Sequence, residues 1–112
     1  RHKVDGDWPA WVQQLTLPLL DGKLDLVSLF MLLAKQNINS VLVEAGPRLC
    51  GALLDKGLVD ELVLYQAPKL MGDEGRGLFH LPGLTRLFQA PKLNIKDVRM
   101  VGPDIRITAR LA

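Results

Sequence analysis

The stretch over residues 41–51 combines residue types that suit the binding of a phosphate group. Gly46 follows the apolar run Val41-Leu42-Val43 and precedes Pro47 and Arg48. A glycine between a buried strand and a helix lets a phosphate approach the backbone without a Cβ in the way. The free N–H groups of the first helical turn then face that anion. The stretch matches neither the GxGxxG motif nor the P-loop, so a plain strand-to-helix turn is the alternative.

Glu44 is the second residue whose side chain could take part in ligand binding or chemistry. The apolar run before it indicates a strand, so its carboxylate is expected at the carboxyl edge of a sheet, where ligands bind in open α/β folds. The alternative is a structural carboxylate that favours the positive end of the following helix. Cys50, in the first turn of that helix, is either a reactive thiol or, more commonly, a small buried apolar side chain.

The composition of the chain excludes several other classes of protein. The formal net charge is only +2 and aromatic residues make up 5%, so nucleic acid is not expected as a partner. His2 and His80 form no metal-ligand spacing with Cys50, and no metal site is predicted. No nucleophile-elbow motif surrounds Ser28 or Ser40. The single cysteine indicates a reducing, cytoplasmic compartment, and no apolar run approaches the roughly 20 residues of a membrane helix.

Two helices are expected from apolar periodicity and capping residues. The first covers residues 25–36, with Asp25 as N-cap and Asn37 as the stop. The second begins at Pro47 and ends at Lys56-Gly57, where glycine suits the left-handed cap.

Strands are expected between and after these helices, at residues 11–19, 40–45 and 61–67. A terminal antiparallel hairpin is expected from residues 92–101 and 105–111, around Gly102-Pro103-Asp104. Residues 69–91 are expected to be irregular, with a short helical turn near residues 84–88. Because strands and helices alternate, the fold class is α/β, with a mostly parallel sheet and flanking helices.

An ordered succession of motifs gives the chain a resemblance to a known family. The motifs are residues 37–47 (NINSVLVEAGP), 51–54 (GALL), 57–62 (GLVDEL), 67–70 (APKL), 81–84 (LPGL) and 101–104 (VGPD). In this order they resemble the C-terminal part of the reductase domain of bifunctional deaminase/reductases of riboflavin biosynthesis. The resemblance covers about residues 24–111, and the succession is more specific than any single motif.

The resemblance implies a dihydrofolate-reductase-like fold that binds NADPH. The implied reaction reduces the ribosylamino group of a phosphorylated aminopyrimidine, 5-amino-6-(5-phosphoribosylamino)uracil, to a ribitylamino group. Glu44 would contact this small-molecule substrate. The NADPH phosphates would be cradled by Gly46, Pro47, Arg48, Leu49, Cys50, Gly51 and Ala52. No residue of the chain is expected to perform the hydride step itself, because that chemistry belongs to the cofactor.

Residues 1–112 are therefore expected to be the C-terminal portion of a reductase domain within a longer enzyme, and to be inactive alone. The zinc-binding motifs of the family's deaminase domain and the first half of its reductase domain are absent from the chain. A homodimer through sheet edges or the terminal hairpin is expected. Two alternatives stay open: a reductase of another heterocycle on the same fold, and a non-catalytic self-association module.

Overall fold

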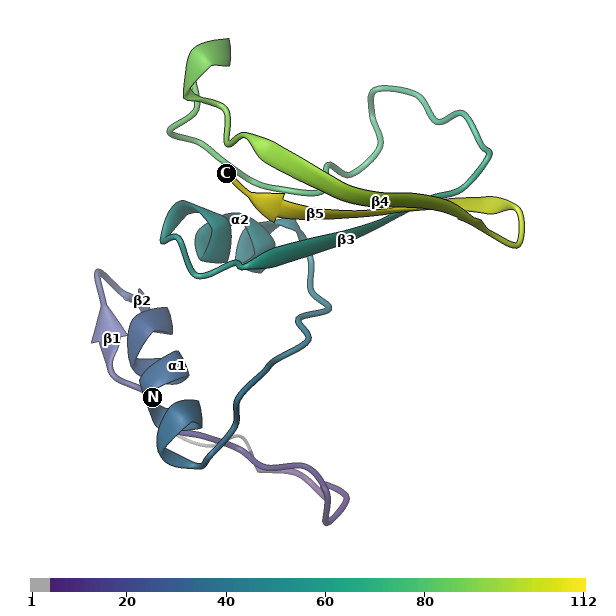
Figure 1. Ribbon diagram of the computed structural model, residues 1–112. Helices are drawn as coiled ribbons and strands as arrows, with labels where there is room; N and C mark the ends of the chain where they lie inside the picture. Colours follow the sequence, from purple (N-terminus) through teal and green to yellow (C-terminus); the bar gives the residue numbers. More distant parts are fainter. Residues whose placement is uncertain (1–4) are drawn as a thin grey trace. The chain divides into compact units, whose positions relative to one another are not determined.

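Figure 1 shows a computed structural model of the chain, which describes residues 5–112. The chain divides after Leu42 into two compact units. Among the described residues, Leu17 and Leu26 are the buried apolar residues of the first unit, and Leu53 and Ala109 those of the second. The helices and strands together confirm the α/β class. Within residues 5–112, neither α-helix has the length and apolar content that crossing a membrane requires.

The first unit contains α1 (Leu26–Lys35), which confirms the helix predicted there. Asp25 is its N-cap, because one carboxylate oxygen accepts hydrogen bonds from the N–H groups of Val27 at 3.1 Å and Ser28 at 3.3 Å. Asn37 ends the helix in the left-handed region, at φ 61°. Both ends of α1 are therefore set by the residues that the sequence indicates.

The strand predicted over residues 11–19 is wrong except at its last residue. The first unit instead has a minimal hairpin of β1 (Leu19–Leu20) and β2 (Lys23–Leu24). Asp21 and Gly22 join the two strands at φ 51° and φ 75°, and two positive φ angles are typical of a type I′ turn. Within the described part of the chain, residues 12–18 belong to no strand, so their loose alternation of apolar and polar residues was not a sufficient signal.

In the second unit, α2 (Pro47–Asp55) begins and ends as predicted. Pro47 stands at the first helical position, where the missing N–H of proline removes no helical hydrogen bond. Gly57 follows the helix at φ 66° and donates its N–H to the carbonyl oxygen of Leu54 at 3.1 Å. A left-handed glycine is needed there, because a side chain would strain the backbone.

A three-stranded sheet forms the rest of the second unit, with strand order β3 (Glu61–Gln66), β5 (Asp104–Leu111) and β4 (Leu93–Val101). The predicted terminal hairpin is confirmed as β4 and β5. Gly102 and Pro103 form its two-residue loop, with Gly102 at φ 58°. A glycine at the first central position and a proline, with φ near −65°, at the second suit a type II′ turn.

The prediction of a mostly parallel sheet is wrong for the described residues, because every strand pair among them is antiparallel. Residues 40–45 belong to no strand, and the side chain of Leu42 is 81% exposed. An apolar run becomes a strand only where a neighbour satisfies its N–H and C=O groups. β3 is a strand as predicted, but its neighbour β5 comes from the end of the chain, and the local alternation of elements does not reveal such a pairing.

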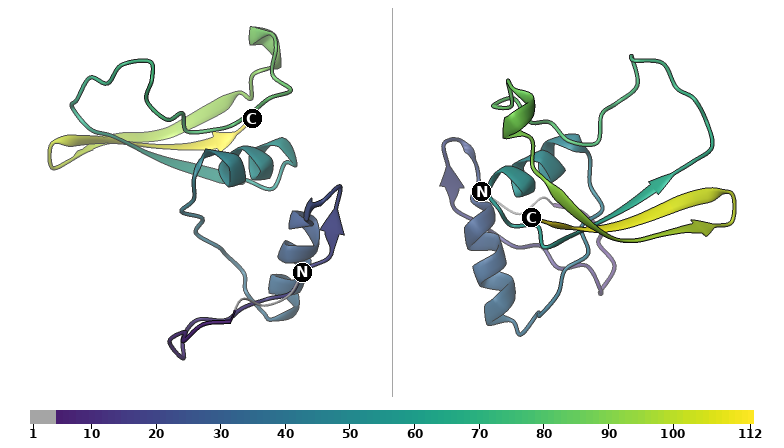
Figure 2. Two further views of the ribbon diagram at one scale, coloured as in Figure 1. Left: turned by 180° about the vertical axis from the view of Figure 1, so that it is seen from behind. Right: turned by 45° about the horizontal axis from the view of Figure 1, so that its top comes forward.

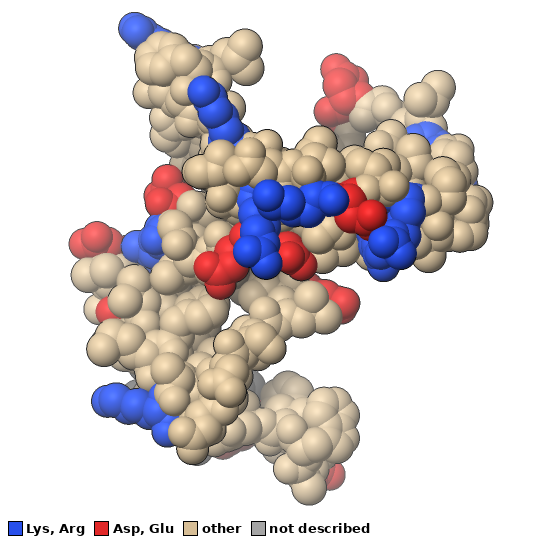
Figure 3. Space-filling view, in the orientation of Figure 1, with Lys and Arg blue, Asp and Glu red and all other residues tan. Residues whose placement is uncertain are grey.

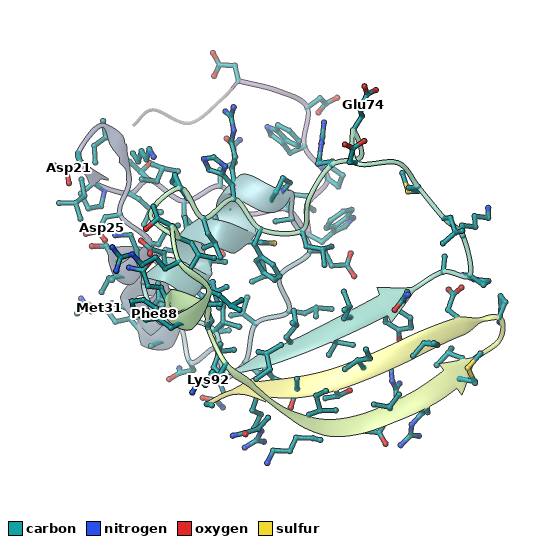
Figure 4. All side chains as sticks on the ribbon, turned by 90° about the horizontal axis from the view of Figure 1, so that it is seen from above. Asp21, Asp25, Met31, Glu74, Phe88 and Lys92 are labelled. Carbon is teal, nitrogen blue, oxygen red and sulfur yellow. The ribbon has the colours of Figure 1, made fainter. Side chains whose placement is uncertain are left out.

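The long segment between β3 and β4 is irregular, as predicted, except for one short helical turn. That turn is η1 (Leu87–Gln89), which overlaps the predicted residues 84–88. Figure 2 shows the segment arching away from the end of β3 and returning over α2. Figure 4 shows Glu74 at its outer bend, away from the sheet. Where the segment returns, its apolar side chains join those of α2 and of all three strands around a cavity of about 250 Å³.

The other face of the sheet is charged. Nε of Arg99 lies 2.7 Å from Oδ2 of Asp97, and a guanidinium nitrogen of Arg106 lies 3.6 Å from the same oxygen. At the far end of the ladder, Nε of Arg110 lies 3.7 Å from a carboxylate oxygen of Glu61. Figure 3 shows the resulting mixture of basic and acidic side chains over the sheet. Opposite charges therefore pair both within β4 and across neighbouring strands on this face.

A β-bulge in β4 decides which face Asp97 occupies. Ile95 pairs with Ala109, and Asp97 pairs with the next residue of β5, Thr108. Lys96 therefore has no residue opposite it on β5, and the residues on either side of it point to opposite faces of the sheet. The bulge thus places the Asp97 carboxylate on the charged face.

We expect Asp97→Asn to lower the thermal stability of the intact protein slightly at pH 7 and to have a smaller effect at pH 3. The hydrogen bond from Arg99 lowers the pKa of Asp97 below its usual value of 3.8. A lowered folded-state pKa stabilises the protein above the unfolded pKa, and this stabilisation is lost as the pH falls through the folded pKa. Melting curves of both proteins at the two pH values test this. Asp73→Asn, in the exposed loop, is the control, and an equal loss in both variants would contradict the assignment.

Candidate functional site

The first turn of α2 leaves two backbone N–H groups without a helical acceptor. The first i to i−4 hydrogen bond of the helix runs from the N–H of Cys50 to the carbonyl oxygen of Gly46, at 3.1 Å. Pro47 has no N–H, so the unused donors are those of Arg48 and Leu49. Gly46, the N-cap, provides no side chain to accept from them. The start of α2 therefore presents donors to an external acceptor.

The charges around this turn also favour an anion. The first turn of α2 contains no acidic residue, and Arg48 lies in it with its side chain exposed. The helix macrodipole adds a partial positive charge at the same end. We refer to residues 44–49 as the Gly46 turn. It brings together the carboxylate, the glycine and the arginine that the sequence singles out.

Glu44 lies in the Gly46 turn, two residues before the N-cap, and is exposed. The N-terminus of α2 has no side-chain cap, so Glu44 makes no capping hydrogen bond. Glu44 therefore does not cap α2 through a hydrogen bond, and its alternative role, a charge that favours the helix macrodipole, is tested by mutation. Its carboxylate is open to a ligand that offers hydrogen-bond donors.

The two glycines of this region have opposite surroundings. A Cβ added to Gly46 would meet no atom within 4 Å, and its φ of −74° and ψ of 174° are accessible to any residue. Neither the backbone nor the packing of the described residues thus requires glycine at position 46. Gly51 is buried, and a Cβ there would overlap the carbonyl oxygen of His80. Gly51 therefore faces protein, whereas Gly46 faces open space.

The remaining residues of the expected cradle differ in exposure. The thiol of Cys50 is half-buried and donates to the carbonyl oxygen of Ala45, with Sγ 3.3 Å from that oxygen. Leu49 is 43% exposed, and Ala52 is half-buried. The hydrogen bond from Cys50 links α2 to Ala45, the residue before its N-cap.

His80 is the residue that sequence reasoning missed. The sequence assigns it to no metal site and to no other role, and its side chain is exposed. Its backbone N–H, however, donates to the carbonyl oxygen of Pro47 at 2.9 Å, so the returning segment contacts the start of α2. A backbone contact between distant residues leaves no pattern in residue types. His2 lies outside the described residues, and no metal-binding group of His, Cys, Asp or Glu side chains occurs in residues 5–112.

Comparison with known proteins shows which family the chain is similar to. The family model described as the RibD C-terminal domain matches residues 4–107. The riboflavin biosynthesis protein RibD of Escherichia coli (strain K12) is 57% identical over 99 residues, which are 88% of this chain and 27% of that protein. The 5-amino-6-(5-phosphoribosylamino)uracil reductase of Buchnera aphidicola subsp. Acyrthosiphon pisum (strain APS) is 34% identical over 100 residues, 89% of this chain and 48% of that protein.

A solved structure gives the same result for the fold. Acinetobacter baumannii RibD, form 2, is similar with a TM-score of 0.74 and 32% sequence identity, over 81% of this chain and 27% of that one. The chain thus spans 27% of the length of these two RibD proteins and 48% of the length of the reductase.

Proposed function

Since the chain belongs to the RibD C-terminal domain family, we propose that it is the C-terminal portion of a reductase of riboflavin biosynthesis. The proposed substrate is 5-amino-6-(5-phosphoribosylamino)uracil and the proposed cofactor is NADPH. The observation that carries this proposal is the 34% identity, over 89% of the chain, to a protein named as that reductase. The donors and charges of the Gly46 turn support the same assignment.

The Gly46 turn fits the phosphates of NADPH. The space beside Gly46 is open, and any side chain there would project into it. The N–H groups of Arg48 and Leu49 would donate to phosphate oxygens, and the Arg48 guanidinium would add a charge-assisted hydrogen bond. Pro47 fixes the backbone at the start of the helix without competing as a donor. Cys50 and Ala52 belong to the same proposed cradle.

Glu44 is assigned to the substrate. A carboxylate accepts hydrogen bonds only, so it would select hydroxyl and amino groups of the pyrimidine or its sugar. Its exposure leaves both oxygens accessible, and the Gly46 turn places it near the proposed cofactor site. When bound, NADPH supplies the hydride that reduces the ribosylamino group. The residues of this chain hold and orient the two molecules.

Further properties of the enzyme are part of the same proposal. The single cysteine supports a cytoplasmic location, since a reducing compartment keeps its thiol free. We assign no metal to this part of the enzyme, and zinc to the deaminase part of the bifunctional relatives. A homodimer is the proposed assembly, because the sheet of the second unit ends on two unpaired edges among the described residues.

Replacing Gly46 by valine in the full-length enzyme tests the proposed cofactor site. We expect NADPH to bind severalfold more weakly, because the valine side chain fills the space that a phosphate would occupy. The fold should persist, because the backbone angles of Gly46 suit any residue. A fluorescence titration with NADPH measures the affinity, and circular dichroism confirms folding. Unchanged affinity in the folded variant would remove this turn from the cofactor site.

A further inference from the structure

The start of α2 is held at two backbone carbonyl groups, one on each side of Gly46. Before Gly46, the carbonyl oxygen of Ala45 accepts from the Cys50 thiol at 3.3 Å. After it, the carbonyl oxygen of Pro47 accepts from the N–H of His80 at 2.9 Å. Glycine is the most flexible residue, and such ties on both neighbours restrict the conformations that it samples.

The hydrogen bond from His80 to Pro47 requires the backbone of residue 80 to approach the backbone of α2 closely. We define the crossing segment as residues 78–81, the part of the returning loop that passes over α2. A Cβ on Gly51 would lie 2.8 Å from the carbonyl carbon of His80 and 2.9 Å from its nitrogen, closer than real Cβ contacts. The φ of Gly51 is not in the left-handed region, so its backbone conformation does not require glycine. Gly51 is needed because it leaves room for the crossing segment.

We propose that Gly51 and the backbone of His80 act as positioning residues, which fix the first turn of α2 in the orientation that binds the NADPH phosphates. This inference rests on the proposed function. It assigns Gly51 to the support of the site, not to contact with the phosphate, because protein backbone already fills the space beside it. Donors held in place before the ligand arrives lose less entropy on binding, so loss of the tie should weaken cofactor binding.

The experiment compares two substitutions of His80 in the full-length enzyme. His80→Pro removes the N–H that bonds to Pro47, and His80→Ala keeps it while removing the exposed imidazole. We expect His80→Pro to raise the Kd and KM for NADPH severalfold, while kcat at saturating NADPH and the KM for the pyrimidine change little. His80→Ala should match the wild type. Gly51→Ala, which displaces the crossing segment, should resemble His80→Pro.

Three results would overturn the inference. One is an unchanged NADPH affinity in His80→Pro, and another is an equal loss in both His80 variants, which would implicate the imidazole. The third is that His80→Pro and Gly51→Ala fail to fold where His80→Ala folds, because the tie would then serve the fold and not the cofactor.

Gly46→Val in the same titration separates this inference from the proposed function. If Gly46→Val weakens NADPH binding and the folded His80→Pro does not, only the positioning role is wrong. If neither substitution weakens binding, the phosphates do not lie at the Gly46 turn, and the proposed cofactor site fails with it.

Discussion

The isolated 112-residue chain is expected to show no NADPH-dependent turnover and to form a homodimer. The chain spans 48% of the length of the reductase that it resembles. The resemblance to that family implies that the nicotinamide side of the pocket lies in the first half of the reductase domain, outside this chain. Glu44 would then bind part of the pyrimidine, and the Gly46 turn would bind the phosphates of NADPH. Nothing would hold the two molecules in the orientation for hydride transfer, so the rate enhancement that comes from orientation would be lost. Measurable turnover by this chain, assayed at the protein concentration used for the full-length enzyme, would contradict the proposed division of the site.

Self-association of the isolated chain is expected through β3. Both edge strands of the sheet offer unpaired N–H and C=O groups, but β4 carries a bulge and Lys96, two features that discourage edge pairing. β3 has neither feature, and its Val63 and Tyr65 are 44% and 54% exposed. A second copy that pairs along β3 would cover these side chains. The strand edge that the prediction favours is therefore that of β3, not that of the terminal hairpin.

Light scattering at micromolar concentration measures this association. Val63→Lys should yield a monomer, because a lysine on an edge strand disfavours pairing with a second strand. Val98→Lys, on an exposed position of β4, is the matched control and should leave the dimer intact. A monomeric wild-type chain would disprove association. A dimer lost only in Val98→Lys would move the interface to the hairpin.

Glu44→Gln in the full-length enzyme is expected to reduce activity by at least about tenfold, equivalent to roughly 1.4 kcal/mol of transition-state stabilisation. Glutamine keeps the shape of the side chain but loses charge-assisted hydrogen bonds, each worth roughly 1.5–3 kcal/mol. The melting temperature should change little, because Glu44 is exposed and does not cap α2. Steady-state kinetics and thermal melting are the two measurements.

Asp55→Asn provides the control for Glu44→Gln. Asp55 is an exposed carboxylate at the other end of α2, so its neutralisation should leave turnover unchanged. If Glu44→Gln instead lowers the melting temperature strongly and turnover stays intact, Glu44 serves the helix macrodipole, as the structural alternative states.

The elements that could be predicted from the sequence are those whose signals are local. Asp25 and Asn37 bound α1, and Pro47 and Gly57 bound α2, because capping depends on residues within one turn of the helix end. The terminal hairpin was predictable for the same reason, since its two-residue loop itself favours the turn.

What could not be predicted depends on contacts between distant residues. Residues 40–45 have the composition of a buried strand, but a strand also needs a partner, and β3 pairs with β5 from the far end of the chain. The role of Gly51 was missed in the same way. The sequence suggests the same phosphate-binding role for Gly51 and Gly46. The two roles differ only because the backbone of His80 lies against Gly51, whereas the space beside Gly46 is open. The cofactor and substrate roles within the site came from family resemblance, because a Gly-Pro turn is common in strand-to-helix connections.

The bulge at Lys96 makes β4 tolerant of a change in length. Without Lys96, Ile95 and Asp97 would be consecutive residues that point to opposite faces, as in a regular strand. Each side chain of β4 would then stay on the face that it occupies now. A deletion at this single position therefore shifts no downstream side chain across the sheet, whereas one elsewhere in β4 would invert the rest of the strand. In an alignment of relatives, position 96 is the place in the hairpin where a gap carries no structural meaning.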